Sequence, residues 1–547
     1  MRLRSYQSAA IEAIKNEWLD HTSTMVVMAT GLGKTVTFAH LIKDMDLPRV
    51  LVVAHREELI MQAQQKIQQI TGFRCDIEMA DRRAELHCMI DPPRVIISTI
   101  QTQTAGGDGR GRMTRFNPDD FDMLIIDENH HAVASTYKRM IAYYSQNPKL
   151  KILGVTATPD RADESALGQV FETCAFDYDI LSGIEDGWLV PVNQQMVTIE
   201  GLDYSHIRTT AGDLNGADLG EVMEAEKNLQ GVADATLNII GGKRTLVFTA
   251  TVAQAERLAE IFNRHKEASA EFVCGKTDKD KRREILGRFL SGQTQIVTNC
   301  AVMTEGYDNP AVEVIIMAKP TKSRSLYAQM AGRSLRPSES IANTLNDWPL
   351  PEMRRHQIKT SNKPTALIVD FVGNAGRHKL CSTADILGGK FDDDVVAKAV
   401  KKAKEANGPV DMTQLLEEEL MQIEEEKQRE AARRARLIAK SRYSCQTVDP
   451  FDVFKIKQPK TRGWDEHKQL SEKQKAILEK QGIKVDDMTY TQGHALLKEI
   501  FKRWDNKLCS YKQAKMLMKR GLNPDVSMEE ARAIIDSIAI KEGWAKK

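Results

Sequence analysis

The sequence has little of what marks a secreted, zinc-binding or membrane-spanning protein. Its eight cysteines are scattered over 547 residues without a Cys-x-x-Cys pair, which argues against a zinc module and a disulfide framework and favours a reducing compartment. No run approaches the roughly 18 apolar residues of a membrane-spanning helix. The N-terminal stretch Met1–Gln7 lacks the apolar core of a signal peptide. We therefore expect a soluble, cytoplasmic protein without membrane contact.

Net charge is also nearly absent, at +1, so bulk charge excludes no class of partner. The distribution of charge is uneven, because residues 441–547 contain 22 Lys and Arg against 15 Asp and Glu. The C-terminal tail is therefore the basic part of the chain. At about 100–200 residues per domain, the length predicts three or four domains.

A glycine-rich turn at residues 28–35, Met-Ala-Thr-Gly-Leu-Gly-Lys-Thr, is the most informative stretch. The apolar run 25–28 predicts a buried parallel strand before it, and the spacing of residues 36–45 predicts a helix after it. In that setting backbone N–H groups surround the phosphates of ATP, the Lys neutralises charge, and the Thr hydroxyl binds Mg²⁺. An ordinary glycine-rich turn is the alternative. The candidate ATP ligands are Thr30, Gly31, Gly33, Lys34 and Thr35, and Thr35 is also a candidate metal ligand.

A second stretch, Phe121–His130, is an apolar strand that ends in two adjacent carboxylates. Asp127 is expected to hold Mg²⁺, and Glu128 to orient or deprotonate the attacking water. His130 is expected near the γ-phosphate. A phosphate loop and a strand that ends in Asp-Glu together predict an enzyme that hydrolyses ATP.

The alternation of strands and helices restarts near residue 243, with further strands predicted at 244–251 and 295–300. Downstream, Gln329, Arg333 and Arg336 are spaced by four and three residues, so they share one side of a helix. This half of the chain has no phosphate loop. Its arginines are therefore expected to act on the ATP of the first domain as arginine fingers, which stabilise transition-state charge. A solvated helix face is the alternative for an isolated Arg-x-x-Arg.

In order, these segments resemble the motifs of superfamily 2 helicases over residues 4–337. The third residue of the Asp-Glu-x-His box, Asn129, is Ala or Cys in the best-known subgroups. The run Asp370–Asn374 (Asp-Phe-Val-Gly-Asn) resembles RadD-like repair helicases and the motors of type I and type III restriction enzymes. The C-terminal tail resembles those of phage-borne helicases, so the expected location is the nucleoid of a bacterial or phage-infected cell.

The resemblance implies an α/β fold with two tandem RecA-like, doubly wound parallel-sheet domains, followed by an α-helical C-terminal region. It implies an ATP- and Mg²⁺-dependent helicase or translocase, with DNA favoured over RNA as its track. An RNA helicase is one alternative, and a nucleic-acid loading or remodelling protein with the ATPase as a switch is another. It also implies that the adenine is read by Arg4, Tyr6 and Gln7 and the nucleotide contacted by Gly306 and Asp308.

Turns that follow the predicted strands supply the expected nucleic-acid contacts, because the carboxyl ends of parallel strands lie at one edge of a sheet. The candidates are His55, Arg56, Ser98, Thr99 and Gln101 in the first domain, and Ala250, Thr251, Thr298 and Asn299 in the second. The Gly- and Arg-rich stretch 105–115 is expected to be a flexible surface loop, with a mobile phosphate contact as the alternative.

The C-terminal region contains an internal repeat, in which residues 471–483 recur at 510–522. Each copy is predicted to be a helix that ends in a glycine cap and is followed by a second helix. We expect nucleic acid or a protein partner on this module, with Phe501 and Trp504 in its core. The predicted domains are 1–192 (ATP-binding), 193–242 (linker), 243–390 (second RecA-like domain), 391–443 (charged helical strut), 444–470 (linker) and 471–547 (helical module).

Overall fold

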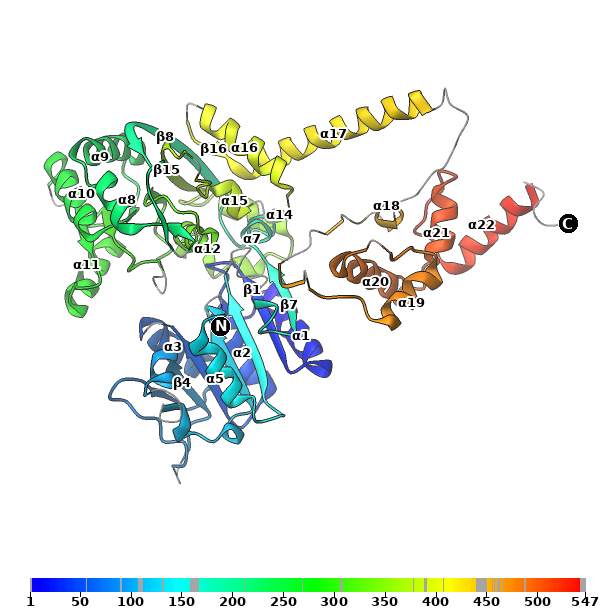
Figure 1. Cartoon of the computed structure of the whole chain (residues 1–547), viewed down its shortest axis with the longest axis horizontal. Helices are drawn as coiled ribbons and strands as arrows, with labels where there is room; N and C mark the ends of the chain where they lie inside the picture. The colour runs from blue at the N-terminus through cyan, green and yellow to red at the C-terminus, as the bar shows by residue number, and fades with distance from the viewer. Residues whose placement is uncertain are drawn as a thin grey trace. The chain divides into compact units, whose positions relative to one another are not determined.

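The computed structural model describes two compact units, one formed by Met1–Asp160 and Val170–Glu424 and the other by Arg161–Gln169 and Glu425–Lys547 (Figure 1). The described residues are 2–55, 57–88, 91–106, 112–129, 132–157, 167–210, 212–267, 269–304, 307, 309–376, 378–387, 391–406, 408–438, 450–454, 456, 458–459, 463–465, 467–486 and 488–541.

The first unit begins with a seven-stranded sheet in the order β3-β4-β2-β5-β6-β1-β7, in which every pairing is parallel. Four of its strands are buried at every position, as expected for a sheet covered by helices on both faces. The strands are β1 (Ser23–Met28), β2 (Val50–Ala54), β3 (Cys75–Glu78), β4 (Val95–Thr99), β5 (Met123–Asp127), β6 (Lys151–Thr156) and β7 (Thr173–Tyr178). The main helices are α1 (Ser5–Asp20), α2 (Lys34–Met45), α3 (Glu57–Thr71), α4 (Ile100–Thr104), α5 (Ser135–Tyr144) and α7 (Ile180–Glu185).

A second seven-stranded sheet follows in the order β12-β13-β11-β14-β15-β8-β16, parallel except for the short edge strand β16. The predicted pair of doubly wound parallel sheets is therefore confirmed. The strands are β8 (Val192–Asp203), β11 (Thr245–Thr249), β12 (Ala270–Val273), β13 (Ile296–Asn299), β14 (Val314–Ala318), β15 (Ala366–Asn374) and β16 (Val410–Asp411). Its helices include α8 (Gly216–Met223), α9 (Glu226–Ile240), α10 (Val252–His265), α11 (Lys279–Ser291), α12 (Arg324–Ala331), α14 (Pro351–Lys359) and α15 (Thr383–Leu387).

The stretch expected to be a linker, 193–242, belongs instead to the second domain. Strand β8 pairs with β15 over most of its length, and helices α8 and α9 pack in the same core as the second sheet. Most side chains of β8 are only partly buried, because β8 lies next to the short edge strand β16. This strand therefore lacks the continuous apolar run by which the other strands were found.

The predicted strut also begins inside the second domain. Helix α16 (Asp393–Glu405) and the start of α17 (Met412–Ile438) bury Val395, Ala399 and Leu416 in the core of the first unit. Glu419 of this charged region is buried and forms an ion pair with Lys402. The remainder of the α17 backbone is helical, as the pattern of residues 415–435 predicted.

The C-terminal module is helical and contains the two expected units, formed by α19 (Glu472–Gln481) with α20 (Tyr490–Asp505) and by α21 (Tyr511–Met518) with α22 (Met528–Lys541). Ser471 and Ser510 cap the first helix of each unit through reciprocal bonds with a Gln three residues on. Helix α18 (Pro450–Phe454), placed by the sequence in a linker, packs into the core of this module. No helix in the described part of the chain is long and apolar enough to cross a membrane.

Phe501 and Trp504 are not core residues of this module, contrary to expectation. Their side chains are 42% and 45% exposed, while Leu496, Leu497 and Ile500 fill the buried face of α20. The helical period explains the difference, because the buried side chains occupy one stripe of α20 and the two aromatics lie outside it.

A buried polar cluster ties α12 to the second sheet. The Tyr327 hydroxyl on α12 donates to the Asp370 carboxylate on β15 at 2.7 Å, and the Gln194 amide on β8 donates to the same oxygen. Burial raises the pKa of Asp370 to about 6, although both hydrogen bonds act in the opposite direction. This carboxyl group therefore makes the stability of the domain depend on pH.

We expect the Asp370→Asn variant to lose part of that pH dependence. Between pH 4 and 6 the unfolded chain ionises Asp370 while the folded chain holds its proton, so the free energy of unfolding falls as pH rises, by up to about 3 kcal/mol. Melting temperatures of wild type and variant at pH 4.5 and 7 measure the difference. Asp394→Asn on the exposed side of α16 is the matched control, and an Asp370→Asn profile parallel to that of the wild type would contradict the expectation.

Candidate nucleotide-binding and nucleic-acid sites

The glycine-rich turn connects β1 to α2, as predicted. Gly31 and Gly33 have φ values of +91° and +78°, a left-handed conformation in which a side chain would be strained. Gly33 is the N-cap of α2, so the loop brings backbone N–H groups and the positive end of the helix dipole together. This geometry suits a polyphosphate.

Lys34 and Glu128 face each other beside this loop. The Lys34 ammonium donates to the Glu128 carboxylate at 2.9 Å, and the two side chains are only 13% and 11% exposed. Glu128 has a φ of +51°, which is rare for a residue other than glycine. The backbone N–H of Glu128 donates to the Asp127 carboxylate at 3.0 Å, at the end of β5. Such strain at a charged, nearly buried residue is typical of catalytic sites.

The residue set also fits a magnesium ion that is bound mainly by phosphate and water. Asp127 is the carboxylate at the end of β5, and Thr35 lies at the start of α2. Within the described ranges, no three His, Cys, Asp or Glu side chains gather into a metal site of their own. Mg²⁺ characteristically takes one or two protein ligands plus substrate phosphates, so these two residues are sufficient candidates.

Tyr6 and Gln7, expected to read adenine, brace the phosphate loop. The Tyr6 hydroxyl and the Gln7 amide both donate to the carbonyl of Leu32, at 2.7 and 3.1 Å. Tyr6 also stacks on Tyr178 with ring centroids 4.6 Å apart, and Gln7 accepts the backbone N–H of Arg4. The loop conformation therefore depends on α1, which sequence reasoning missed. The reading of adenine by these residues stays a prediction.

Arg336 and Gly332 of the second domain approach the phosphate loop. A Cβ atom built on Gly31 would lie 3.3 Å from Cγ of Arg336, and one built on Gly332 would lie 2.5 Å from Cβ of Thr30. The two domains are thus in contact at the phosphate loop, and glycine is required at position 332 for that contact. Gln329 is buried on α12.

The predicted helix face shared by Gln329, Arg333 and Arg336 is not found, because α12 ends at Ala331 and both arginines follow it. Arg333 makes contacts of its own. Its guanidinium donates to the carbonyls of Tyr307 and Thr304, at 2.5 and 2.6 Å. In this structure Arg333 therefore holds the backbone at Thr304 and Tyr307. Four of the predicted site residues, Arg56, His130, Gly306 and Asp308, lie outside the described residues.

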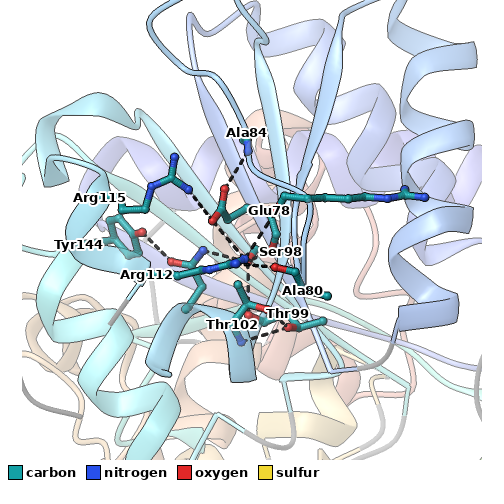
Figure 2. Close-up of polar contacts among 11 residues, drawn as sticks. Glu78, Ala80, Ala84, Ser98, Thr99, Thr102, Arg112, Arg115 and Tyr144 are labelled. Atoms are coloured by element: carbon teal, nitrogen blue, oxygen red, sulfur yellow. Dashed lines mark hydrogen bonds and ion pairs between the residues drawn. The ribbon is translucent and has the colours of Figure 1, made fainter. Parts of the chain in front are cut away.

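The first domain presents a polar edge at the carboxyl ends of β2 and β4. His55 and the exposed Gln101 lie within 3.5 Å of each other there, across these neighbouring strands. Thr99 caps α4 by accepting the backbone N–H of Thr102 (Figure 2). Ser98 is fully buried, donates to the carbonyl of Glu78 and accepts the Gln103 amide, so its side chain is not placed to touch nucleic acid.

A buried carboxylate, Glu78 at the end of β3, organises this edge (Figure 2). It accepts the backbone N–H of Ala84 and the Arg115 guanidinium, both at 2.7 Å, and lies 3.5 Å from the Arg112 guanidinium. The two arginines at the end of the Gly- and Arg-rich stretch are thus ion-paired within the protein. This pairing disagrees with the alternative prediction that these arginines are mobile phosphate contacts. The sequence offered no signal for Glu78 beyond its place at a strand end.

Replacing Glu78 with Ala is expected to lower the free energy of unfolding of the first domain by about 3 kcal/mol. The change leaves Arg112 and Arg115 without their buried counter-ion and the Ala84 N–H without an acceptor. Thermal melting measures the loss, and the exposed Asp119→Ala is the control from the same region. A melting temperature equal to that of the control would show that the contacts of Glu78 with Arg112, Arg115 and Ala84 add nothing to stability.

In the second domain, the polar side chains at the end of β13 point inward. Thr298 donates to the carbonyl of Ala255, and Asn299 donates to Val247 and accepts the N–H of Met303. Both are fully buried, so the expected side-chain contacts of Thr298 and Asn299 with nucleic acid disagree with the structure. Ala250 and Thr251 are partly exposed at the start of α10, where the Thr251 hydroxyl caps the helix.

Two family descriptions match the chain. Residues 1–161 match "Type III restriction enzyme, res subunit" and residues 230–338 match "Helicase conserved C-terminal domain". These matches include the segments that carry the phosphate loop, the Asp-Glu pair, and Arg333 and Arg336 after helix α12. They confirm the resemblance to the motors of restriction enzymes.

Curated relatives match about three-fifths of the chain. The "Putative ATP-dependent helicase IRC3" of Saccharomyces cerevisiae is 31% identical over 61% of this chain and 49% of its own length. A "Type I restriction enzyme EcoAI endonuclease subunit" of Escherichia coli is 27% identical over 61% of this chain and 44% of its own. The "DNA 3'-5' translocase XPB2" of Sulfurisphaera tokodaii is 23% identical over 62% of this chain and 80% of its own. The chain spans about half the length of the first two.

Among solved structures, a fragment of a putative HsdR subunit of a type I restriction enzyme from Vibrio vulnificus is similar. It has a TM-score of 0.47 and 21% sequence identity, and the match covers 68% of this chain and 64% of that one.

Proposed function

We propose that the chain is a member of helicase superfamily 2 and that it is an ATP-dependent translocase or helicase that moves along DNA. The single observation that carries the proposal is the approach of Arg336 to Gly31, which brings a cation of the second domain to the phosphate loop of the first. A nucleotide bound there would contact both domains. Its hydrolysis would therefore change how the domains hold each other.

In this mechanism, Lys34 exchanges its partner. It is paired with Glu128 at 2.9 Å, and a phosphate chain on the loop would compete for the same ammonium. Release from Lys34 would leave the Glu128 carboxylate able to orient a water and accept its proton. Asp127 and Thr35 would hold Mg²⁺, which supplies charge neutralisation on the phosphates.

The second domain contributes Arg336 and Arg333. Arg336 would stabilise the charge that develops on the transferred phosphoryl group. Arg333 donates to the carbonyls of Thr304 and Tyr307, so a movement of the turn after α12 would be passed to these two residues. The candidates for the nucleic-acid track that are at least partly exposed are His55 and Gln101 in one domain and Ala250 and Thr251 in the other. Alternating contacts in the two domains would move the protein along one strand.

DNA is favoured over RNA as the track because the relatives named for a substrate, a DNA translocase and a restriction endonuclease subunit, act on DNA. An RNA helicase remains the second enzyme hypothesis, since contacts to a single-stranded backbone discriminate poorly between the two. A loading protein with a switch-like ATPase is the third. The paired Lys34 and Glu128 and the placement of Arg336 favour a working motor over a relic.

The test is ATP turnover by the full-length protein, alone and with single-stranded DNA, duplex DNA, forked DNA or single-stranded RNA. Turnover that rises with one form of DNA and is lost in Lys34→Ala supports the proposal and names the track. Stimulation by RNA alone would show that the track is RNA and not DNA. No turnover under any condition would refute the motor.

A further inference from the structure

An aromatic pair on α20 of the C-terminal module is left in solvent. The rings of Phe501 and Trp504 contact each other edge to face, with centroids 5.3 Å apart and planes at 62°. Both side chains are more than two-fifths exposed, although the module has a buried apolar core of its own. A large aromatic pair held in water forgoes favourable burial, so a function for it is expected.

The pair is held rigidly, because Arg503, one of the two residues between Phe501 and Trp504, is fixed by several hydrogen bonds. Arg503 is 3% exposed and donates to the carbonyls of Cys509 and Pro524, at 3.2 and 2.7 Å. It also forms an ion pair with Asp525 at 2.7 Å. These bonds join the end of α20 to the second repeat and fix the direction in which Phe501 and Trp504 project. A pre-oriented surface loses less entropy when it binds a ligand.

The net charge around the pair is positive, although Glu499 forms an ion pair with Lys502 at 3.6 Å and the exposed Asp505 follows Trp504. Lys498 and Lys502 are exposed on the same helix, three residues before and one residue after Phe501. The following segment, residues 506–524, contains five Lys or Arg and no Asp or Glu. Lys507 and Lys512 are exposed in that segment. Exposed aromatic rings among cations can bind a flexible polyanion that carries planar rings, because the rings stack and the charges pair.

We propose that α20 and the segment that follows it form a second binding site, for single-stranded DNA, outside the two motor domains. Bases stack on Phe501 and Trp504, and the backbone phosphates pair with Lys498, Lys502 and Lys507. The choice of DNA over RNA rests on the proposed function, whereas the site itself rests on the aromatic pair and its charges. Because this module and the motor belong to one chain, a strand bound here would be present at a raised effective concentration for the motor.

Nucleic acid fits this surface better than a protein partner does. The sequence left both open for the C-terminal repeats. Protein interfaces are depleted in lysine at their centre, but exposed lysines lie directly beside this aromatic pair. Single-strand binding sites instead combine a positive surface with aromatic side chains on which bases stack without sequence preference.

The test compares the full-length wild type with a Phe501→Ala, Trp504→Ala double variant. The probe is fluorescein-labelled (dT)20 in fluorescence polarisation, and bound complexes are also crosslinked by ultraviolet light and mapped to peptides. The control is Leu350→Ala with Met353→Ala, which removes two side chains of similar exposure from the second domain. We expect at least about tenfold weaker binding in the aromatic variant, near-wild-type binding in the control, and wild-type adducts on α20.

Equal affinity of wild type and aromatic variant, with adducts confined to residues 1–424, would overturn the site and leave the pair as a protein-docking surface. If ATP turnover still rises with DNA in that case, the proposed motor function stands. Loss of (dT)20 binding in the aromatic variant, together with wild-type turnover that ignores DNA, would support the site and refute the motor. A Lys498→Glu, Lys502→Glu variant should weaken binding and reduce its dependence on salt.

Discussion

Replacing Arg336 with Ala is expected to lower DNA-stimulated ATP turnover by about a thousandfold or more, the usual effect of removing an arginine finger. Arg336 lies against Gly31. Among the described contacts, it is the cation of the second domain that comes nearest to the phosphate loop. The expected loss is in kcat, because the guanidinium acts on charge that develops only in the transition state. Binding of a fluorescent ATP analogue should change little.

Arg336→Lys separates the finger from a general need for positive charge. Lysine is a point charge that cannot reproduce the planar fork of donors, so we expect only partial recovery of turnover. The control is Arg283→Ala on the exposed surface of α11 in the same domain, which should turn over ATP like the wild type. Turnover within tenfold of the wild type in Arg336→Ala would show that the contact with Gly31 has no catalytic role.

Replacing Glu128 with Gln is expected to lower kcat by about a hundredfold to ten-thousandfold, because the amide cannot accept a proton from the attacking water. The change keeps the size of the side chain and its place at the strained φ of +51°. It also removes the negative partner of Lys34, so the ammonium no longer has to leave an ion pair when phosphate binds. We therefore expect affinity for ATP to be equal or higher.

Steady-state turnover and a direct ATP-binding assay on the same preparation check both halves of this expectation. Glu256→Gln, on the exposed side of α10, is the control for a change of one charge. A variant that binds ATP weakly but turns over at the wild-type rate when saturated would contradict the assignment of Glu128 as the base.

The ATP site could be predicted from the sequence because its main residues follow local patterns. The phosphate loop and the Asp127-Glu128 pair each occupy one strand end, and the alternating strands and helices bring these ends to one edge of the sheet. Arg336 was singled out because this half of the chain lacks a phosphate loop of its own, although the helix predicted to carry it ends at Ala331. The pairing of Lys34 with Glu128 required the fold, since 94 residues separate them.

The missed features depend on neighbours that are distant in sequence. Ser98 and Asn299 follow apolar strands like residues of a binding loop, but neighbouring strands and loops satisfy their hydrogen bonds and bury them. Glu78 is a charged residue that its arginine partners keep in the interior. Phe501 and Trp504 are apolar like core residues, but they lie on the surface of the module. Only the packing of α20 shows which of its apolar side chains are buried.

The most direct measurement of the central claim is the displacement of a triplex-forming oligonucleotide from duplex DNA, and of a streptavidin block from single-stranded DNA, by the full-length protein with ATP. The account predicts displacement from at least one of the two tracks by the wild type and none by Glu128→Gln or Arg336→Ala. DNA-stimulated ATP turnover without displacement on either track would contradict a motor that moves along DNA.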